Sequence, residues 1–135
     1  MTGKVCCRPH LGIDIIEAPR IEAALERWGD RFRERIYTPA ELARYRRRPL
    51  SLAARFAAKE AVMKALGTGV RGVGWKDIEI LPDARGKPTV TLYGRGLARA
   101  QMLNIQVWEI SLTHSRDLAV ASVVALAPLD IGALE

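Results

Sequence analysis

Residues 51–67, with the sequence SLAARFAAKEAVMKALG, form the stretch around which the rest of the chain is expected to fold. The stretch is rich in alanine and leucine, which favour helices more than most other residues do. Ser51 suits the N-cap of a helix, and Gly67 suits its C-terminal end. Because the stretch is so apolar, we predict a long helix that is mostly buried at the centre of the domain.

One stripe of this helix carries an acid and a base beside an aromatic ring. Phe56, Glu60 and Lys64 are spaced four residues apart, so they lie on one side of the helix. Buried charges need an opposite charge or a metal ion, which makes the stripe a candidate site. The alternative is a surface ion pair of Glu60 with Lys64, worth about 0.2–0.5 kcal/mol, and helix spacing alone favours that pair.

The composition is that of a folded domain with a core. The chain has 135 residues, of which 49% are hydrophobic. No apolar run approaches the length of about 18 residues that crosses a membrane, and we expect no signal peptide. The two cysteines are adjacent in the sequence, which fits a cytoplasmic protein. We predict a loose leader at residues 1–10, a single domain at 11–127 and a tail at 128–135.

Two polar features mark the N-terminal segment. Cys6, Cys7 and His10 form a Cys-Cys-x-x-His pattern, but no second pair of ligands follows it, so free thiols are the favoured interpretation. Residues 11–16 are apolar except for Asp14, and they predict a strand. A carboxylate within such a strand needs a compensating partner, unless it points to water from the end of the strand.

The rest of the pattern predicts short helices and two hairpins. A helix is expected at residues 18–28, and a second one follows a capping box at Thr38 and Glu41 and ends near Arg46. Further elements are a helix at 96–103 and strands at 77–81, 89–93, 107–113 and 118–126. The predicted fold class is therefore α+β, with the long central helix packed on an antiparallel β-sheet.

The net charge of +6 favours acidic partners of any kind, among them nucleic acid, anionic lipid, phosphorylated ligands and acidic proteins. Only 6% of the residues are aromatic, and no RNA-binding motif is present in the sequence. Residues 44–48 contain clustered arginines. Such a cluster suits either a phosphate site or the solvated basic end of a helix.

Three segments, in this order along the chain, resemble the holo-(acyl-carrier-protein) synthases, which are small 4'-phosphopantetheinyl transferases: residues 12–15 (GIDI), 55–69 (RFAAKEAVMKALGTG) and 111–115 (SLTHS). Residues 38–42 and 83–88 also resemble segments of this family. The resemblance runs from about residue 12 to residue 126, and the three segments together make it specific. One departure is His10, which stands where the family usually has glycine.

The resemblance implies an enzyme that transfers 4'-phosphopantetheine from coenzyme A to a serine of an apo acyl carrier protein and releases 3',5'-ADP, with magnesium as its cofactor. The implied partners are coenzyme A and an acidic carrier protein of fatty-acid or polyketide synthesis, with no membrane and no nucleic acid. Members of this family are homotrimers whose active sites lie between neighbouring subunits.

The resemblance also implies which residues carry the chemistry. Asp14 and Glu60 would hold magnesium, which prefers one or two carboxylates together with phosphate oxygens and water. Lys64, one turn beyond Glu60, would neutralise the coenzyme diphosphate or protonate the leaving oxygen. Either Glu60 or a water on the metal would take the serine proton, and this choice stays open.

Two further groups of residues are implied to bind the substrates. Coenzyme A is expected to contact basic residues, glycines and the Thr-His pair of the third segment: Arg46, Arg55, Lys64, Gly67, Gly86, Lys87, Pro88, Thr113 and His114. The acidic carrier protein is expected to contact Arg20 and Arg27 on the helix at residues 18–28.

Two other functions stay open from the residues alone. A nucleic-acid-binding domain would use the arginines of residues 44–48, and its binding would depend steeply on salt. A magnesium-dependent nucleotide hydrolase would release its products without any carrier protein. Incubation with apo carrier protein, coenzyme A and magnesium separates these functions from the transferase.

Overall fold

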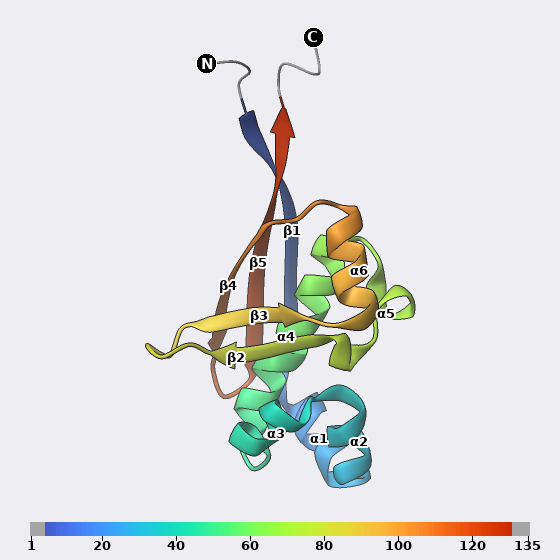
Figure 1. The fold of residues 1–135 in the computed structure, drawn as a ribbon. Coiled ribbons are helices and arrows are strands. Elements are labelled where there is room, and N and C mark those ends of the chain that lie inside the picture. The colour runs from blue at the N-terminus through green and yellow to red at the C-terminus, as the bar shows by residue number, and fades with distance from the viewer. Residues whose placement is uncertain (1–4, 131–135) are drawn as a thin grey trace.

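A three-stranded antiparallel sheet and one long helix form the centre of the computed structural model, which describes residues 5–130. The strands are β1 (Val5–Glu17), β4 (Val107–His114) and β5 (Leu118–Asp130), in the order β1-β5-β4. Helix α4 (Pro49–Leu66) packs against β1 and β5 (Figure 1). The predicted α+β class, with a long central helix on an antiparallel sheet, is confirmed.

Helix α4 starts earlier than predicted. It begins at Pro49 with Arg48 as the N-cap, so Ser51 lies inside the first turn. Proline is favoured at the first helical position, where its missing N–H is not needed. The helix stops before Gly67, as predicted, whose φ of 73° is a left-handed conformation that glycine adopts without strain. Neither α4 nor any other helix of the described part is long and apolar enough to cross a membrane.

A close approach between β1 and α4 sets the register of the two elements. A Cβ atom at Gly12 would overlap the backbone carbonyl oxygen of Ala61, so only glycine fits there. Side chains alternate along a strand, and Asp14, two residues further on, therefore faces α4 as well. Because Ala61 follows Glu60 in the helix, this register brings Asp14 beside the acidic residue of the predicted stripe.

A second, two-stranded sheet crosses α4 (Figure 1). It is the hairpin of β2 (Ile78–Pro82) and β3 (Pro88–Leu92), and each strand lies within one residue of its predicted bounds. Helix α6 (Gly94–Met102) follows it and packs against α4. The remaining short elements are helix α5 (Gly69–Gly72) and the 3-10 helix η1 (Trp75–Asp77). Apolar side chains of both sheets meet on α4 and form the larger of two buried clusters.

Three short helices gather at one end of α4 (Figure 1): α1 (Ala18–Trp28), α2 (Asp30–Ile36) and α3 (Pro39–Tyr45). The bounds of α1 and the capping box at Thr38 agree with the sequence-based predictions. Helix α2 was not predicted. It is separated from α1 by Gly29, which has a φ of 55°, and its seven residues are too few for a clear helical pattern.

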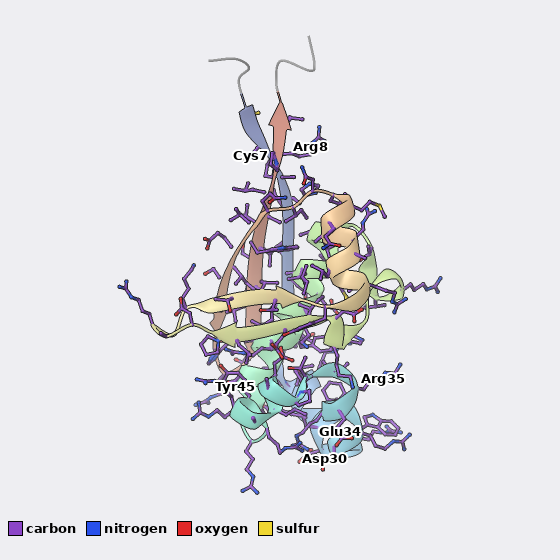
Figure 2. The ribbon with its side chains drawn as sticks, viewed as in Figure 1. Cys7, Arg8, Asp30, Glu34, Arg35 and Tyr45 are labelled. Carbon is purple, nitrogen blue, oxygen red and sulfur yellow. The ribbon has the colours of Figure 1, made fainter. Side chains whose placement is uncertain are left out.

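The predicted loose leader and tail are wrong for the parts that the structure describes. Strand β1 begins at Val5 and β5 continues to Asp130, and the two strands pair along their whole lengths. This pairing gives hydrogen-bond partners to the backbone groups on the facing sides of the two segments, and no local pattern shows it because the strands are far apart in the sequence. Cys7 lies on this ribbon, away from the short helices, as a free thiol (Figure 2). The first four and the last five residues lie outside the described part of the chain.

Candidate functional site

Strand β1 and helix α4 bring an aspartate and a lysine together. The Oδ1 atom of Asp14 lies 3.1 Å from the Nζ atom of Lys64. The same Nζ donates a hydrogen bond of 2.9 Å to the backbone oxygen of Ile13. The side chain of Asp14 is 11% exposed, whereas that of Lys64 is 55% exposed. The pair therefore lies at the surface end of a partly buried cluster, where a ligand can reach it.

Glu60 belongs to the same cluster. Burial raises the pKa of the Glu60 carboxyl above its usual value, and the negative charge of Asp14 and a hydrogen bond with Asp14 raise it further. The charges of Lys64 and Arg20 act in the opposite direction, but they do not cancel the rise. The two carboxyl groups are thus close enough to repel each other when both are ionised. Such a pair is a place where a bound cation would be stabilised.

This donor set fits magnesium. Magnesium is held in proteins by one or two carboxylates, with water and substrate phosphate oxygens as the other ligands. Within residues 5–130, no group of three or more His, Cys, Asp or Glu side chains is arranged to hold a metal ion. Asp14 and Glu60 would therefore supply two ligands, and a phosphate substrate and water would supply the rest.

A second group of predicted residues lines a cavity at the opposite edge of the sheet, along β4. The cavity has a volume of about 380 Å³ and is lined by residues of α4, the β2–β3 turn and β4: Ala54, Arg55, Gly86, Lys87, Pro88, Ile110, Ser111, Leu112 and His114. Five of these residues were predicted to bind coenzyme A: Arg55, Gly86, Lys87, Pro88 and His114. The fold thus brings together segments that are far apart in the sequence.

The other residues predicted to bind coenzyme A lie outside this cavity. Lys64 lies in the last turn of α4, beside Asp14, and Gly67 is the C-cap of that helix. Thr113 lies on β4 but does not line the cavity. Arg46 follows the end of α3, where its NH1 atom lies 2.6 Å from the Oδ1 atom of Asp30. The predicted coenzyme residues are therefore divided between at least two places on this subunit.

Comparison with known proteins identifies the family. The model of the 4'-phosphopantetheinyl transferase superfamily matches residues 10–123 of the chain. The chain belongs to this superfamily. The predicted family and enzyme class are therefore confirmed, and the comparisons do not favour the nucleic-acid-binding alternative.

Several relatives of this phosphopantetheinyl transferase are similar over nearly their whole length. The holo-(acyl-carrier-protein) synthase of Solidesulfovibrio magneticus is 56% identical over 116 residues, which cover 84% of this chain and 94% of that protein. The structure of the Helicobacter pylori holo-(acyl-carrier-protein) synthase in complex with coenzyme A has a TM-score of 0.78 and 34% identity, over 85% of this chain and 98% of that chain. The structure of the Bacillus anthracis holo-(acyl-carrier-protein) synthase in complex with CoA (3',5'-ADP) has a TM-score of 0.71 and 39% identity, and the match covers 87% of this chain and 96% of that chain.

A buried ion pair in this phosphopantetheinyl transferase was not predicted from the sequence. The Nζ atom of Lys59 lies 2.7 Å from the Oε1 atom of Glu41, and both side chains are fully buried. The same Nζ donates hydrogen bonds of 2.8 Å to the backbone oxygen of Ile36 and 3.1 Å to that of Trp75. Lys59 thus joins α4 to α2, α3 and η1.

The partners of Glu41 complete this network. Its carboxylate accepts hydrogen bonds of 2.8 Å from the backbone N–H groups of Thr38 and Ile80. Burial lowers the pKa of Lys59, and the charge of Glu41 opposes that change. The signal in the sequence that could have shown the pair is a lysine within an apolar stretch of the helix. Glu41 already had a role as the acidic residue of the capping box, so the sequence does not indicate a second partner. That role was correct and incomplete.

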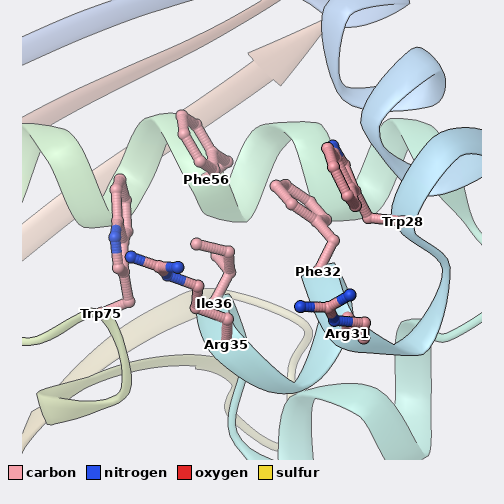
Figure 3. Close-up of a pocket in the computed structure, with 7 residues that line it drawn as sticks. All are labelled: Trp28, Arg31, Phe32, Arg35, Ile36, Phe56 and Trp75. Atoms are coloured by element: carbon pink, nitrogen blue, oxygen red, sulfur yellow. The ribbon is translucent and has the colours of Figure 1, made fainter.

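An aromatic and basic cavity near the three short helices was also missed. It has a volume of about 480 Å³, and Figure 3 shows its lining: Trp28, Arg31, Phe32, Arg35, Ile36, Phe56 and Trp75. Phe56, from the predicted stripe, stacks on Trp75 with ring centroids 4.7 Å apart. The guanidinium carbon of Arg27 lies 4.9 Å from the centroid of the Trp28 ring. One predicted carrier-binding arginine is thus beside this cavity, while Arg20 acts on the carboxylate cluster.

Proposed function

We propose that the protein transfers the 4'-phosphopantetheine group of coenzyme A to a serine of an acyl carrier protein and releases 3',5'-ADP. The observation that carries the proposal is the carboxylate pair of Asp14 and Glu60 beside Lys64. Phosphoryl transfer is catalysed chiefly by positioning and by neutralising charge, which this cluster is built to do. The names of the relatives, and the coenzyme A in two of their structures, support the same chemistry.

Each residue of the cluster has a role in this proposal. Asp14 and Glu60 would hold magnesium, which when bound supplies positive charge to the diphosphate of the coenzyme. Lys64 neutralises the same diphosphate with its accessible ammonium group, or gives a proton to the oxygen that leaves with 3',5'-ADP. Glu60 or water accepts the proton of the attacking serine, and the new bond joins the serine oxygen to the phosphorus of the phosphopantetheine arm.

The cavity along β4 is the proposed place for the nucleotide end of coenzyme A. Arg55 and Lys87 supply positive charge there, and His114 adds a ring that can donate a hydrogen bond. The turn that contains Gly86 lets the backbone come close to a ligand, because this glycine has a φ of 87° and no neighbour within 4 Å of a Cβ position. Contacts from Arg46 and Thr113 stay predictions.

The carboxylate cluster and the coenzyme cavity lie at opposite edges of the sheet, because β5 separates β1 from β4. Arg55 and Glu60 are also about 140° apart around α4. We therefore propose that one coenzyme uses the two places from neighbouring subunits of a homotrimer. The outer face of β1 supports this assembly, since Leu11, Ile13 and Ile15 are 66%, 64% and 60% exposed.

The carrier protein is proposed to dock on α1 and the aromatic cavity beside it. Arg20 and Arg27 are exposed on α1, and Arg31 and Arg35 line the cavity. Positive charge around an apolar centre suits an acidic partner with a few apolar side chains, and it speeds the encounter of the two proteins. A carrier of fatty-acid or polyketide synthesis and a cytoplasmic location stay predictions from the sequence.

The test is incubation of the protein with apo carrier protein, coenzyme A and magnesium, followed by mass spectrometry of the carrier. We expect the carrier to gain the mass of one phosphopantetheine arm and 3',5'-ADP to form in equal amount. Formation of 3',5'-ADP at the same rate without carrier would instead identify a hydrolase. Absence of transfer, with tight and salt-dependent binding to DNA or RNA, would support the nucleic-acid-binding alternative.

Mixing two inactive variants tests the shared site. Asp14→Ala damages the carboxylate cluster and Arg55→Met damages the coenzyme cavity, so neither protein alone should work at low coenzyme concentration. After exchange of subunits in an equal mixture, trimers with sites between neighbours should regain about a quarter of the parent activity, because some interfaces combine two intact halves. A mixture that stays inactive after proven exchange would place the whole site within one subunit.

A further inference from the structure

Tyr45, the last residue of α3, contacts Arg55 of the coenzyme cavity in two ways. Its hydroxyl oxygen accepts a hydrogen bond of 2.8 Å from the NH2 atom of Arg55. Its ring also lies under the guanidinium group, whose carbon is 3.9 Å from the ring centroid. The tyrosine is itself buried, with 6% of its surface exposed, in the smaller of the two hydrophobic clusters. Figure 2 shows its place at the α3 end of the molecule.

The rest of the Arg55 guanidinium is poorly paired. Its NH1 atom is 3.4 Å from the backbone oxygen of Ser51, which is a long hydrogen bond. Its Nε atom is buried and has no hydrogen-bond partner within residues 5–130. Leaving a buried donor without an acceptor costs free energy, and the part of Arg55 that lines the cavity is the part that an anion can reach. The arginine is therefore held on one side and unsatisfied on the other.

The chemistry of tyrosine matters for this arrangement. A carboxylate in place of Tyr45 would hold the guanidinium more strongly, but it would also cancel the positive charge that an anion needs. A neutral phenol fixes the plane of the guanidinium through its ring and its hydroxyl oxygen and leaves the whole charge available. Burial lowers the pKa of Arg55, and the contact with Tyr45 opposes that change.

We propose that Tyr45 is the positioning residue that orients Arg55 toward the 3'-phosphate of coenzyme A, and so sets the preference of the enzyme for coenzyme A over its 3'-dephospho form. The inference rests on the proposed function, in which Arg55 belongs to the coenzyme cavity. Tyr45 does not line that cavity, so it acts through Arg55 rather than by touching the substrate. Holding the arginine in its binding orientation lowers the entropy lost when the phosphate arrives.

Two variants of Tyr45 separate its hydroxyl group from its ring. Tyr45→Phe keeps the ring and removes the hydrogen-bond acceptor, so the fold is expected to be retained. The KM for coenzyme A should rise about five-fold, with kcat unchanged within about two-fold. Tyr45→Leu removes the ring as well, and the KM should rise more than about ten-fold. For 3'-dephospho-coenzyme A, both variants should match the parent, measured as KM or as an inhibition constant.

A double-mutant cycle with Arg55→Met shows whether Tyr45 acts through the arginine. Arg55→Met alone should abolish most of the preference for coenzyme A over the dephospho form. In the Arg55→Met protein, adding Tyr45→Phe should change the coenzyme KM by less than about two-fold, because the partner is already gone. Tyr37→Phe is the matched control. It removes a buried hydroxyl that donates 2.7 Å to the backbone oxygen of Leu52, so it should lower Tm without changing coenzyme preference.

The outcomes distinguish this inference from the proposed function. If Arg55→Met reduces the preference and Tyr45→Phe raises the KM for both coenzymes equally, or for neither, the positioning role of Tyr45 is overturned. If Arg55→Met itself leaves the preference intact while transfer to the carrier continues, then Arg55 does not bind the 3'-phosphate, and the inference falls while the transferase activity stands. A full effect of Tyr45→Phe in the Arg55→Met protein would also overturn it.

Discussion

Lys59 and Glu60 are neighbours on α4, but their environments differ completely. Lys59 is fully buried and is paired with Glu41, and its remaining hydrogen bonds go to two backbone oxygens. Glu60 is partly buried, which raises the pKa of its carboxyl, and the neighbouring carboxyl group of Asp14 raises that pKa further. Helix α4 therefore contributes Lys59 to a pair of opposite charges, the balanced pair, and Glu60 to a pair of like charges, the unbalanced pair.

The difference separates structure from function. A buried charge with all its partners present has no capacity left for a ligand, so Lys59 is a residue that holds α2, α3 and η1 on α4. The charges of Lys64 and Arg20 do not cancel the effects of burial and of Asp14 on Glu60, so this carboxylate pair is destabilised until a cation and a phosphate ligand arrive. Perturbed carboxyl groups beside a lysine are typical of functional sites. The following predictions test this contrast, starting with the largest effect.

The largest expected effect is loss of transfer in Asp14→Asn and in Glu60→Gln. Either change removes one charge from the pair that would hold magnesium, and turnover should fall at least about a hundred-fold in saturating magnesium. Both proteins should stay folded, and Glu60→Gln should be at least as stable as the parent, because the repulsion is relieved. Steady-state transfer and thermal melts measure the two properties. Glu34→Gln, an exposed change on α2, is the control. Near-parent turnover of Glu60→Gln would contradict a role of Glu60 in the metal site.

The second prediction concerns the balanced pair. Lys59→Met leaves Glu41 buried without a positive partner, so the free energy of unfolding should fall by about 3–5 kcal/mol. Adding Glu41→Gln should recover part of this loss, since it removes the unpaired charge. Denaturant unfolding measures the change. Lys64→Met at the unbalanced end should cost less than about 1 kcal/mol, and an equal loss in the two lysine variants would refute the contrast.

The sequence predicts those parts of the molecule that depend on local pattern. Periodicity and turn residues predict the long central helix, the capping box at Thr38 and the two hairpins. Helix spacing predicts that Glu60 and Lys64 lie on one stripe. The contact of Asp14 with Lys64 depends on the register between β1 and α4, which the packing of Gly12 sets. That register is a property of the assembled fold.

The features that the sequence did not predict all need segments that are far apart. The buried pair of Lys59 and Glu41 requires α2, α3 and η1 to meet on α4, and no single window of sequence contains that arrangement. The sequence predicts a loose leader at residues 5–10 because their partner strand lies more than a hundred residues further along the chain. Helix α2 was missed because it is short, and the aromatic cavity was missed with it.

The third prediction is that Lys64 acts in the chemical step. Its positive charge should matter more as negative charge builds on the leaving diphosphate, so Lys64→Met should lower kcat about ten-fold or more and change the coenzyme KM less. Methionine keeps the apolar stem and limits damage to packing. Single-turnover transfer with saturating coenzyme measures the effect, with Lys76→Met as an exposed control. A rate within a few-fold of the parent would leave Lys64 as an ordinary partner of Asp14.

The fourth prediction concerns the carrier. Arg27→Glu should raise the KM for an acidic carrier about five-fold at low salt and less at high salt, while the KM for coenzyme A is unchanged. Arg20→Glu should also weaken carrier use, but it is the less selective change because the charge of Arg20 acts on Glu60. The two variants are compared in steady-state assays at two salt concentrations. An unchanged carrier KM in both at low salt would move the docking surface away from α1.

The smallest expected effect is on the pH dependence of stability, and it tests the unbalanced pair directly. The pKa of Glu60 is raised above its ordinary value of 4.5 in the folded protein. The folded state therefore binds the Glu60 proton more tightly than the unfolded state does. Without magnesium, the stability should be highest below pH 4.5 as far as this group is concerned, and it should fall as the pH rises through the folded pKa. Because Glu60 is partly exposed, the loss should stay below about 1 kcal/mol.

Glu60→Gln should lack this pH-dependent part of the stability. Magnesium should stabilise the parent more at high pH than at low pH, since the cation competes with the proton. Thermal melts of both proteins with and without magnesium measure it. The same pH dependence in Glu60→Gln would assign the effect to another group and would contradict a raised pKa of Glu60.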